Sequence, residues 1–239
     1  REKESIHTGF SFALPGAVTH MEMPWSIVRP NTDQLPFANK NWLAIQRWAD
    51  IADNEHGVTW SPIECPLVEF GALSGNLLDG ARQYSLWKKE LAPSARLYSF
   101  VLNNHWDTNF PLEQGGTIKE RYIMQFHKGY QPVAASRFGM ETAQPLLLVQ
   151  TSKKLLQHPL VKLDNNMLLL SYCQRTEKRN VHLLRVKSVS AQEEPLQLSW
   201  PGGRPKQLWL CNAAEEPMEQ TDGHYLLPPY GMATLQAVF

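Results

Sequence analysis

The most informative stretch of the sequence is residues 39–60, NKNWLAIQRWADIADNEHGVTW. Its apolar residues can be drawn on one side of a helix, through Trp42, Ile45 and Trp48, or at alternate positions of a strand. Periodicity alone does not distinguish the helix from the strand. Residues 53–57 are typical of a turn, and an apolar run returns at 58–60. We therefore expect two antiparallel strands joined at residues 53–57 rather than a helix.

Alternation of apolar and polar residues continues outward from this stretch in both directions. Upstream, it runs from Phe10 to Leu14 and again from Met21 to Met23, with a Pro-Gly pair between, which predicts a hairpin. Downstream, residues 119–127 alternate, and we expect the side that carries Tyr122, Met124 and Phe126 to face the core.

Further strands are expected in short segments bounded by Pro, Gly, Asn or Asp. These are residues 97–102, 146–150, 167–173, 180–186, 196–200, 207–211 and 233–239. One short helix is expected at 133–142, where Ala134, Phe138 and Glu141 are helically spaced and Pro132 suits the first turn.

These elements predict a mainly β chain with a boundary near residue 155. Residues 1–155 would form a large antiparallel β-sandwich. From residue 156 to 239 the short strands recur at the spacing of a smaller β-sandwich.

The charge balance restricts the classes of partner. The 23 Lys and Arg residues equal the 23 Asp and Glu residues, so the formal net charge is zero. Nucleic acid and anionic membranes attract proteins through concentrated positive charge, so we expect neither as a partner. No apolar run is long enough for a transmembrane helix. Neutral substrates and protein surfaces therefore remain as the expected classes of partner.

The three cysteines do not form a recognisable disulfide framework or metal motif. Cys65, Cys173 and Cys211 are far apart, and each lies beside apolar residues, so we expect buried free thiols. The chain begins with charged residues and without Met, which indicates a piece of a longer protein.

The densest polar and aromatic cluster is residues 103–110, NNHWDTNF, directly after the expected strand 97–102. Amide, imidazole, carboxylate and indole groups are those that sugar-binding sites use. Two alternatives stay open. Asn and Asp side chains at a strand end can satisfy their own backbone. His105 and Asp107 also have the spacing of two metal ligands, although catalytic zinc normally takes three protein ligands.

Arg47 is a second candidate for ligand contact. It lies between Gln46 and Trp48, so a cation–π contact or a buried ion pair is the structural alternative.

The order of several motifs resembles the C-terminal β-rich region of glycoside hydrolase family 38, the α-mannosidases. The motifs are Pro24-Trp25, Arg29-Pro30, DQLP at 33–36, ANKNW at 38–42, QRW at 46–48, GVT at 57–59, CPLVE at 65–69 and FVLNNHWDTNF at 100–110. Residues 134–138 and 226–235 resemble the same region, so the likeness covers nearly the whole chain and is strongest over 24–150.

This resemblance implies that zinc, the nucleophile and the acid/base carboxylate lie in an N-terminal catalytic domain outside this chain. We therefore expect no catalytic residue and no metal ligand here, and we interpret His105-Trp106-Asp107 as part of the C-terminal region. The implied partners are that catalytic domain and mannose-containing glycans.

The resemblance also implies that the β-region packs on the catalytic domain and lends residues to the rim of its sugar pocket. The candidate substrate-binding residues are Arg47, Asn103, Asn104 and Trp106. By itself, the fragment is expected to be inactive. The alternative from another class of protein is a free-standing carbohydrate-binding module.

Overall fold

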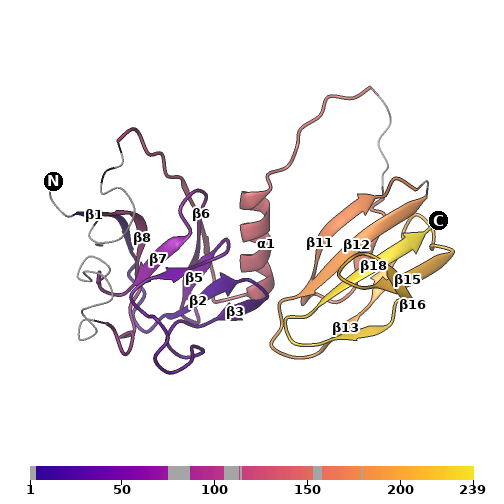
Figure 1. Cartoon of the computed structure of the whole chain (residues 1–239). Coiled ribbons are helices and arrows are strands. Elements are labelled where there is room, and N and C mark those ends of the chain that lie inside the picture. The colour runs from indigo at the N-terminus through magenta and orange to yellow at the C-terminus, as the bar shows by residue number, and fades with distance from the viewer. Residues whose placement is uncertain (1–3, 75–86, 105–112, 114, 153–157, 179) are drawn as a thin grey trace. The chain divides into compact units, whose positions relative to one another are not determined.

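The computed structural model describes residues 4–74, 87–104, 113, 115–152, 158–178 and 180–239. Within them the chain is mainly β with one helix, as expected (Figure 1). Its internal contacts divide it into unit 1, Arg1–Gln131 with Phe138–Pro145, and unit 2, Pro132–Arg137 with Leu146–Phe239. The boundary predicted near residue 155 falls among residues 153–157, outside the described part of the chain.

Unit 1 contains a five-stranded antiparallel sheet with the order β3-β2-β5-β6-β9. Its strands are β2 (Val18–Met23), β3 (Ser26–Val28), β5 (Ala49–Ala52), β6 (Gly57–Pro62) and β9 (Tyr122–His127). Every residue of β5 and β6 is buried.

The hairpin predicted within residues 39–60 is confirmed. Ala49 pairs with Trp60 and Ala52 with Gly57. The turn is closed by the Asp53 side chain, whose Oδ1 accepts backbone N–H groups of Glu55 (2.8 Å) and His56 (2.7 Å). Gly57 is required by close packing, because a Cβ there would lie 2.3 Å from the ring of His127.

The second sheet of unit 1 has the order β1-β8-β7-β4. It consists of β1 (Ser5–Ser11), β4 (Leu43–Ala44), β7 (Leu67–Phe70) and β8 (Arg96–Asn103). The strand predicted at 97–102 is thus confirmed. The two sheets share one core cluster, which includes Met21 and Trp60 from the first sheet and Val68 and Leu97 from the second.

The hairpin predicted between residues 10 and 23 is wrong, because β1 and β2 lie in different sheets. β1 pairs with β8, and β2 pairs with β3 and β5. Phe10 and Met21 nevertheless pack against the same core. Alternation identified the strands correctly, but it does not specify which strand is the partner.

Two other expectations are overturned by exposure. Phe126 is 73% exposed and Met124 41%, because β9 is an edge strand and only Tyr122 among its apolar residues packs against the core cluster.

The strand predicted at 146–150 is absent. Those residues are irregular, and Leu146 is 97% exposed, since no strand of the described chain pairs with them.

The helix predicted at 133–142 is confirmed as α1 (Pro132–Ala143), with proline in its first turn. In its unit 1 portion, Gly139 lies against Trp48, which is fully buried. A Cβ at Gly139 would approach Cδ1 of Trp48 to 2.5 Å. No helix in the described residues is long and apolar enough to cross a bilayer.

Unit 2 contains a five-stranded antiparallel sheet with the order β11-β12-β18-β15-β16 and two ribbons, β10-β14 and β13-β17. The sheet strands are β11 (Leu168–Arg175), β12 (Val181–Ser188), β15 (Gln207–Cys211), β16 (Pro217–Gln220) and β18 (Met232–Val238). The ribbon strands are β10 (Lys162–Leu163), β13 (Glu194–Leu196), β14 (Leu198–Ser199) and β17 (Tyr225–Leu227).

The core of unit 2 lies between these layers. It is formed by residues such as Leu184 and Leu235 of the sheet and Leu196 and Leu227 of the β13-β17 ribbon. The strands predicted at 167–173, 180–186, 207–211 and 233–239 correspond to β11, β12, β15 and β18.

The expectation of three buried thiols is wrong for Cys173. Cys211 is buried and Cys65 is half-buried, but Cys173 lies on the exposed second half of β11.

Candidate functional site

The predicted sugar-site residues Asn103 and Asn104 lie where β8 ends. Asn103 pairs with Ser5 of β1, and the backbone N–H of Asn104 donates to the carbonyl of Glu4 at 3.0 Å. The Glu4 N–H donates in turn to Oδ1 of Asn104. The Asn104 amide therefore helps to close the β1–β8 pair, as strand-end Asn side chains often do. Trp106, with His105 and Asp107, lies outside the described residues.

Arg47 lies between β4 and β5 and forms a two-pronged ion pair with Glu22 of β2. Its Nε donates to Oε2 of Glu22 at 2.8 Å, and its Nη2 donates to Oε1. The Glu22 side chain is fully buried, while the Arg47 side chain keeps 24% of its surface exposed. Burying a carboxylate is costly unless it is paired, so this contact explains how Glu22 is tolerated in the core.

The structure therefore places the predicted residues in two groups. Arg47, in the segment between β4 and β5, lies against the sheet that contains β2, and its guanidinium bonds to Glu22 and to no other described residue. Asn103 and Asn104 belong to the end of β8 in the other sheet.

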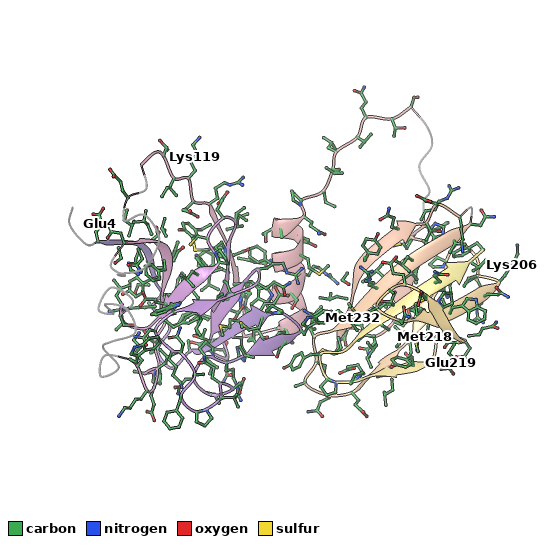
Figure 2. All side chains as sticks on the ribbon, in the orientation of Figure 1. Glu4, Lys119, Lys206, Met218, Glu219 and Met232 are labelled. Atoms are coloured by element: carbon green, nitrogen blue, oxygen red, sulfur yellow. The ribbon has the colours of Figure 1, made fainter. Side chains whose placement is uncertain are left out.

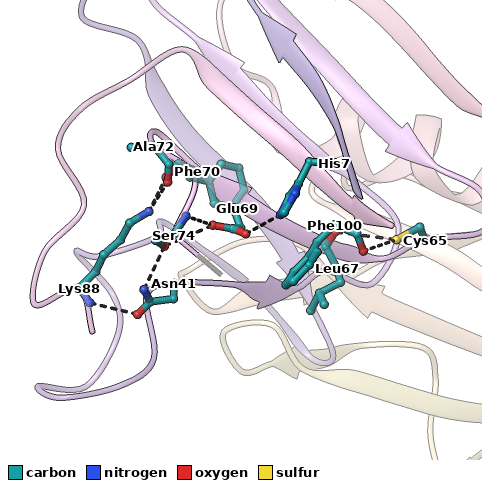
Figure 3. Close-up of polar contacts among 10 residues, drawn as sticks. All are labelled: His7, Asn41, Cys65, Leu67, Glu69, Phe70, Ala72, Ser74, Lys88 and Phe100. Carbon is teal, nitrogen blue, oxygen red and sulfur yellow. Dashed lines mark hydrogen bonds and ion pairs between the residues drawn. The ribbon is translucent and has the colours of Figure 1, made fainter. Parts of the chain in front are cut away.

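A buried polar network that the sequence did not reveal is centred on Glu69 of β7 (Figure 3). One carboxylate oxygen, Oε1, lies 2.8 Å from Nε2 of His7. The other, Oε2, accepts the backbone N–H of Ser74 at 2.7 Å and its hydroxyl at 3.2 Å. The His7 ring stacks on Phe100 with 4.4 Å between the ring centroids.

This network continues through Asn41 to Lys88. The Asn41 amide donates to the Ser74 hydroxyl at 2.9 Å, and Oδ1 of Asn41 accepts the backbone N–H of Lys88 at 3.0 Å. The Lys88 ammonium donates to the carbonyl of Ala72. Burial lowers the pKa of Lys88, and the nearby charge of Glu69 opposes that shift.

The order of groups in this network excludes a serine–histidine nucleophile at Ser74. In a catalytic triad the imidazole stands between the serine and the acid, so that it can take the hydroxyl proton. Here the carboxylate of Glu69 stands between Ser74 and His7. The network instead holds the loops after β7 and before β8 against the sheet.

A second buried acid, Asp50 of β5, pairs with His127 of β9. Nε2 of His127 lies 2.8 Å from Oδ2 of Asp50, which also accepts the Thr59 hydroxyl at 2.5 Å. Burial raises the pKa of Asp50, and the bonds from Thr59 and His127 oppose the rise. Nδ1 of His127 donates to the carbonyl of Gly129 at 2.7 Å. A carbonyl only accepts, so Nδ1 carries a proton.

No cluster of three His, Cys, Asp or Glu side chains that could hold a metal ion occurs in the part of the chain that the structure describes. The zinc implied by the family resemblance therefore has no ligand set among the described residues.

No protein-family model and no curated protein matches this sequence. The fold is similar to an α-mannosidase from Enterococcus faecalis V583, with a TM-score of 0.64 and 15% identity over 98% of this chain. A second structure from Enterococcus faecalis, a protein in glycosyl hydrolase family 38, gives the same values. This chain spans 26% of the length of each. The likeness thus establishes a shared fold with a part of these larger chains.

Proposed function

We propose that this chain is the C-terminal β-region of an α-mannosidase-like glycoside hydrolase. It would pack on an N-terminal catalytic domain of the same polypeptide and complete that domain's sugar pocket. The observation that carries the proposal is the fold similarity, which covers 98% of this chain and 26% of an α-mannosidase chain.

The buried acids support an accessory role better than independent turnover. Glycoside hydrolysis needs two carboxyl groups about 5–10 Å apart on either side of an open site. Glu22, Asp50 and Glu69 are all fully buried and are held by Arg47, His127 and His7, respectively. They stabilise the sandwich and have no access to a substrate.

The end of β8 is the proposed point of contact with sugar. Asn103 and Asn104 lie there, and Trp106 follows two residues later in the sequence. Amide groups can hydrogen-bond to hydroxyls of a mannoside, while an indole can stack on the CH face of the ring. Arg47, whose side chain is partly exposed beside Glu22, is the fourth residue that we propose contacts the sugar.

The proposal is tested by comparing this chain with the intact polypeptide that contains it. We expect the intact polypeptide to release nitrophenol from p-nitrophenyl α-mannoside, and the purified 239-residue chain to release none. An intact polypeptide without α-mannosidase activity would contradict the proposal, as would turnover by the chain alone.

A variant tests the contribution of the β-region to the pocket. In the intact polypeptide, Trp106→Ala should raise KM about tenfold, which corresponds to the loss of one aromatic contact of about 1.4 kcal/mol. Tyr225→Ala, which removes an exposed aromatic ring in unit 2, is the matched control and should leave KM unchanged. If instead the isolated chain binds mannosides and loses that binding on Trp106→Ala, the chain is a carbohydrate-binding module.

A further inference from the structure

Unit 2 contains a polar pocket of about 600 Å³ that neither the resemblance nor the predicted site includes. Its walls come from the turn before β15 and the first residues of that strand, from the end of β16 with residues 221–224 that follow it, and from the β10-β14 ribbon. All of these residues belong to unit 2. The volume lies within the range of about 300–1,000 Å³ that is typical of small-molecule sites.

Backbone hydrogen bonds fix the frame of this pocket. The turn is closed by the Gly203 N–H, which donates to the Trp200 carbonyl at 3.1 Å, and the Lys206 N–H donates to Val238 at 2.7 Å. On the opposite wall, the Thr221 N–H donates to Leu208 at 2.9 Å. In Figure 2, Lys206 lies beside the C-terminal end of β18, and Met218 and Glu219 lie on β16. A preformed frame lowers the ordering cost of binding a ligand.

The polar side chains of the pocket have hydrogen-bonding capacity that the protein does not use. Arg204, Lys206, Gln220 and His224 line the pocket, and their side chains make no hydrogen bond or ion pair with any described residue. Such side chains at a concave surface are available to a ligand.

Two carboxylates add acceptors to these donors. Oδ1 of Asp164 accepts the Ser199 hydroxyl, and Oδ1 of Asp222 accepts the His224 backbone N–H, each at 3.0 Å. The Oδ2 atom of each carboxylate makes no hydrogen bond with a described residue. The His224 N–H lowers the pKa of Asp222, so this carboxylate is ionised at neutral pH.

Trp200 supplies an apolar surface to the same pocket. Its ring packs edge-on against Phe239, with 5.7 Å between the centroids, and the residue stays half-buried. The indole Nε1 has no hydrogen-bond partner among the described residues. Trp200 can thus offer both a ring face and a donor.

The charges around the pocket cancel, and this balance selects the class of ligand. Asp164 and Asp222 oppose Arg204 and Lys206, so neither an anion nor a cation gains a net electrostatic advantage. A neutral polyhydroxy compound can use carboxylate acceptors, guanidinium and amide donors, and an aromatic face together. We infer that this pocket binds a neutral saccharide through Trp200, Arg204, Gln220 and Asp222. The inference concerns unit 2 alone and does not rest on the proposed function.

The test is a calorimetric titration of the full chain with mannobiose, maltose and cellobiose, and separately with sulfate. At least one disaccharide should bind. Arg204→Ala and Asp222→Asn should each weaken its binding about tenfold, the effect of losing one hydrogen bond to a charged group. Both residues are exposed, and Asn at position 222 keeps the Oδ1 acceptor, so the fold is preserved.

Arg175→Ala is the matched control, because Arg175 is an exposed arginine on β11, at the opposite edge of the sheet from β16. It should leave the affinity unchanged. The inference is overturned if no disaccharide binds, if sulfate binds in place of the disaccharides, or if both pocket variants keep the wild-type affinity. The inference is also overturned if disaccharide binding is lost in Trp106→Ala and kept in the pocket variants. The α-mannosidase assay of the intact polypeptide tests the proposed function, so the two tests can fail independently.

Discussion

At the scale of single residues, the Glu22–Arg47 ion pair links β2 to the segment between β4 and β5. The carboxylate is fully buried, and the guanidinium binds both of its oxygens. Removing one partner of such a pair leaves a charge in the core without its counter-ion, which costs more than the pair itself contributes.

We expect Arg47→Ala to lower the free energy of unfolding by about 3 kcal/mol in a urea titration. Combining it with Glu22→Gln should recover part of that loss, because the uncompensated charge is removed. Arg29→Ala is the control, since the Arg29–Asp33 pair is largely exposed and should cost less than about 1 kcal/mol. Equal losses in Arg47→Ala and Arg29→Ala would contradict this account.

His20 makes the stability of unit 1 depend on pH. Burial, helped by the positive charge of Arg29, lowers the pKa of His20 from 6.5 to about 4. Between these values the unfolded chain binds a proton at His20 and the native chain does not. Stability should therefore fall as the pH is lowered from 6.5 towards 4.

His20→Phe should make this decline shallower while keeping the stacking on Tyr130, whose ring centroid lies 3.8 Å from that of His20. The difference should be on the order of 1 kcal/mol once solvent screening is allowed for. Urea titrations at several pH values measure it. His56→Phe, at a site where the side chain is 77% exposed, is the control and should keep the wild-type slope. An unchanged slope in His20→Phe would refute the assignment.

Some of these residues could be anticipated from the sequence, and others could not. The Asp53 turn follows from local chemistry, because its acceptor and donors are at most three residues apart. Glu69 and His7 are separated by 62 positions, and a lone polar residue in an apolar strand does not reveal its partner. Arg47 and Asn104 are predicted to contact sugar, and that prediction stays open; their contacts to Glu22 and Glu4 depend on the tertiary fold and could not be derived from the sequence.

At the scale of secondary structure, the contact between the unit 1 portion of α1 and Trp48, the residue before β5, depends on one missing side chain. Gly139 lies directly against Trp48, so the helix backbone reaches the indole. Alanine would favour the helix by about 1 kcal/mol, but its Cβ would meet Cδ1 of Trp48 at 2.5 Å.

We expect Gly139→Ala to destabilise the protein by about 1–3 kcal/mol, because overpacking outweighs the gain in helix propensity. Denaturant unfolding followed by tryptophan fluorescence measures the change. Glu141→Ala, an exposed substitution in the same helix, should stay within about 0.5 kcal/mol of wild type. A stabilised Gly139→Ala would show that the helix shifts away from Trp48 without cost.

Alternation predicted several strands, but it assigned the partner correctly for β5 and β6 and wrongly for β1 and β2. The β5–β6 hairpin is local and has a turn signal between its strands. By contrast, β1 pairs with β8, so Ser5 lies opposite Asn103. The apolar run at 146–149 has the composition of a strand, yet strand formation needs a partner edge, and none pairs with it in the described chain.

At the scale of the whole molecule, two units with separate cores are joined through a segment that carries four exposed apolar residues, Leu146 to Val149. Exposed, irregular backbone is the preferred substrate of proteases, because it needs no local unfolding to enter the active site.

We expect brief chymotrypsin treatment of the 27.3 kDa chain to cut first within Leu146–Val149. Mass spectrometry of the products would locate the cut. The run of leucines at the start of β11, Leu168–Leu170, is the internal control, since it is paired in the sheet and largely buried. Cleavage at Leu168–Leu170 before Leu146–Val149 would contradict the division into two units.

The pairing of β1 with β8 has a consequence for synthesis in the cell. Among the described residues, the one strand that pairs with β1 is β8, which is translated about ninety residues later; this takes roughly 5–20 s at ribosomal speed. During that interval the nascent chain exposes an unpaired strand with an apolar side, which other nascent chains can capture. The first sandwich can close only after β8 has left the ribosomal tunnel. Its folding is therefore timed by translation, and chaperones that shield β1 during those seconds should raise the yield of native protein.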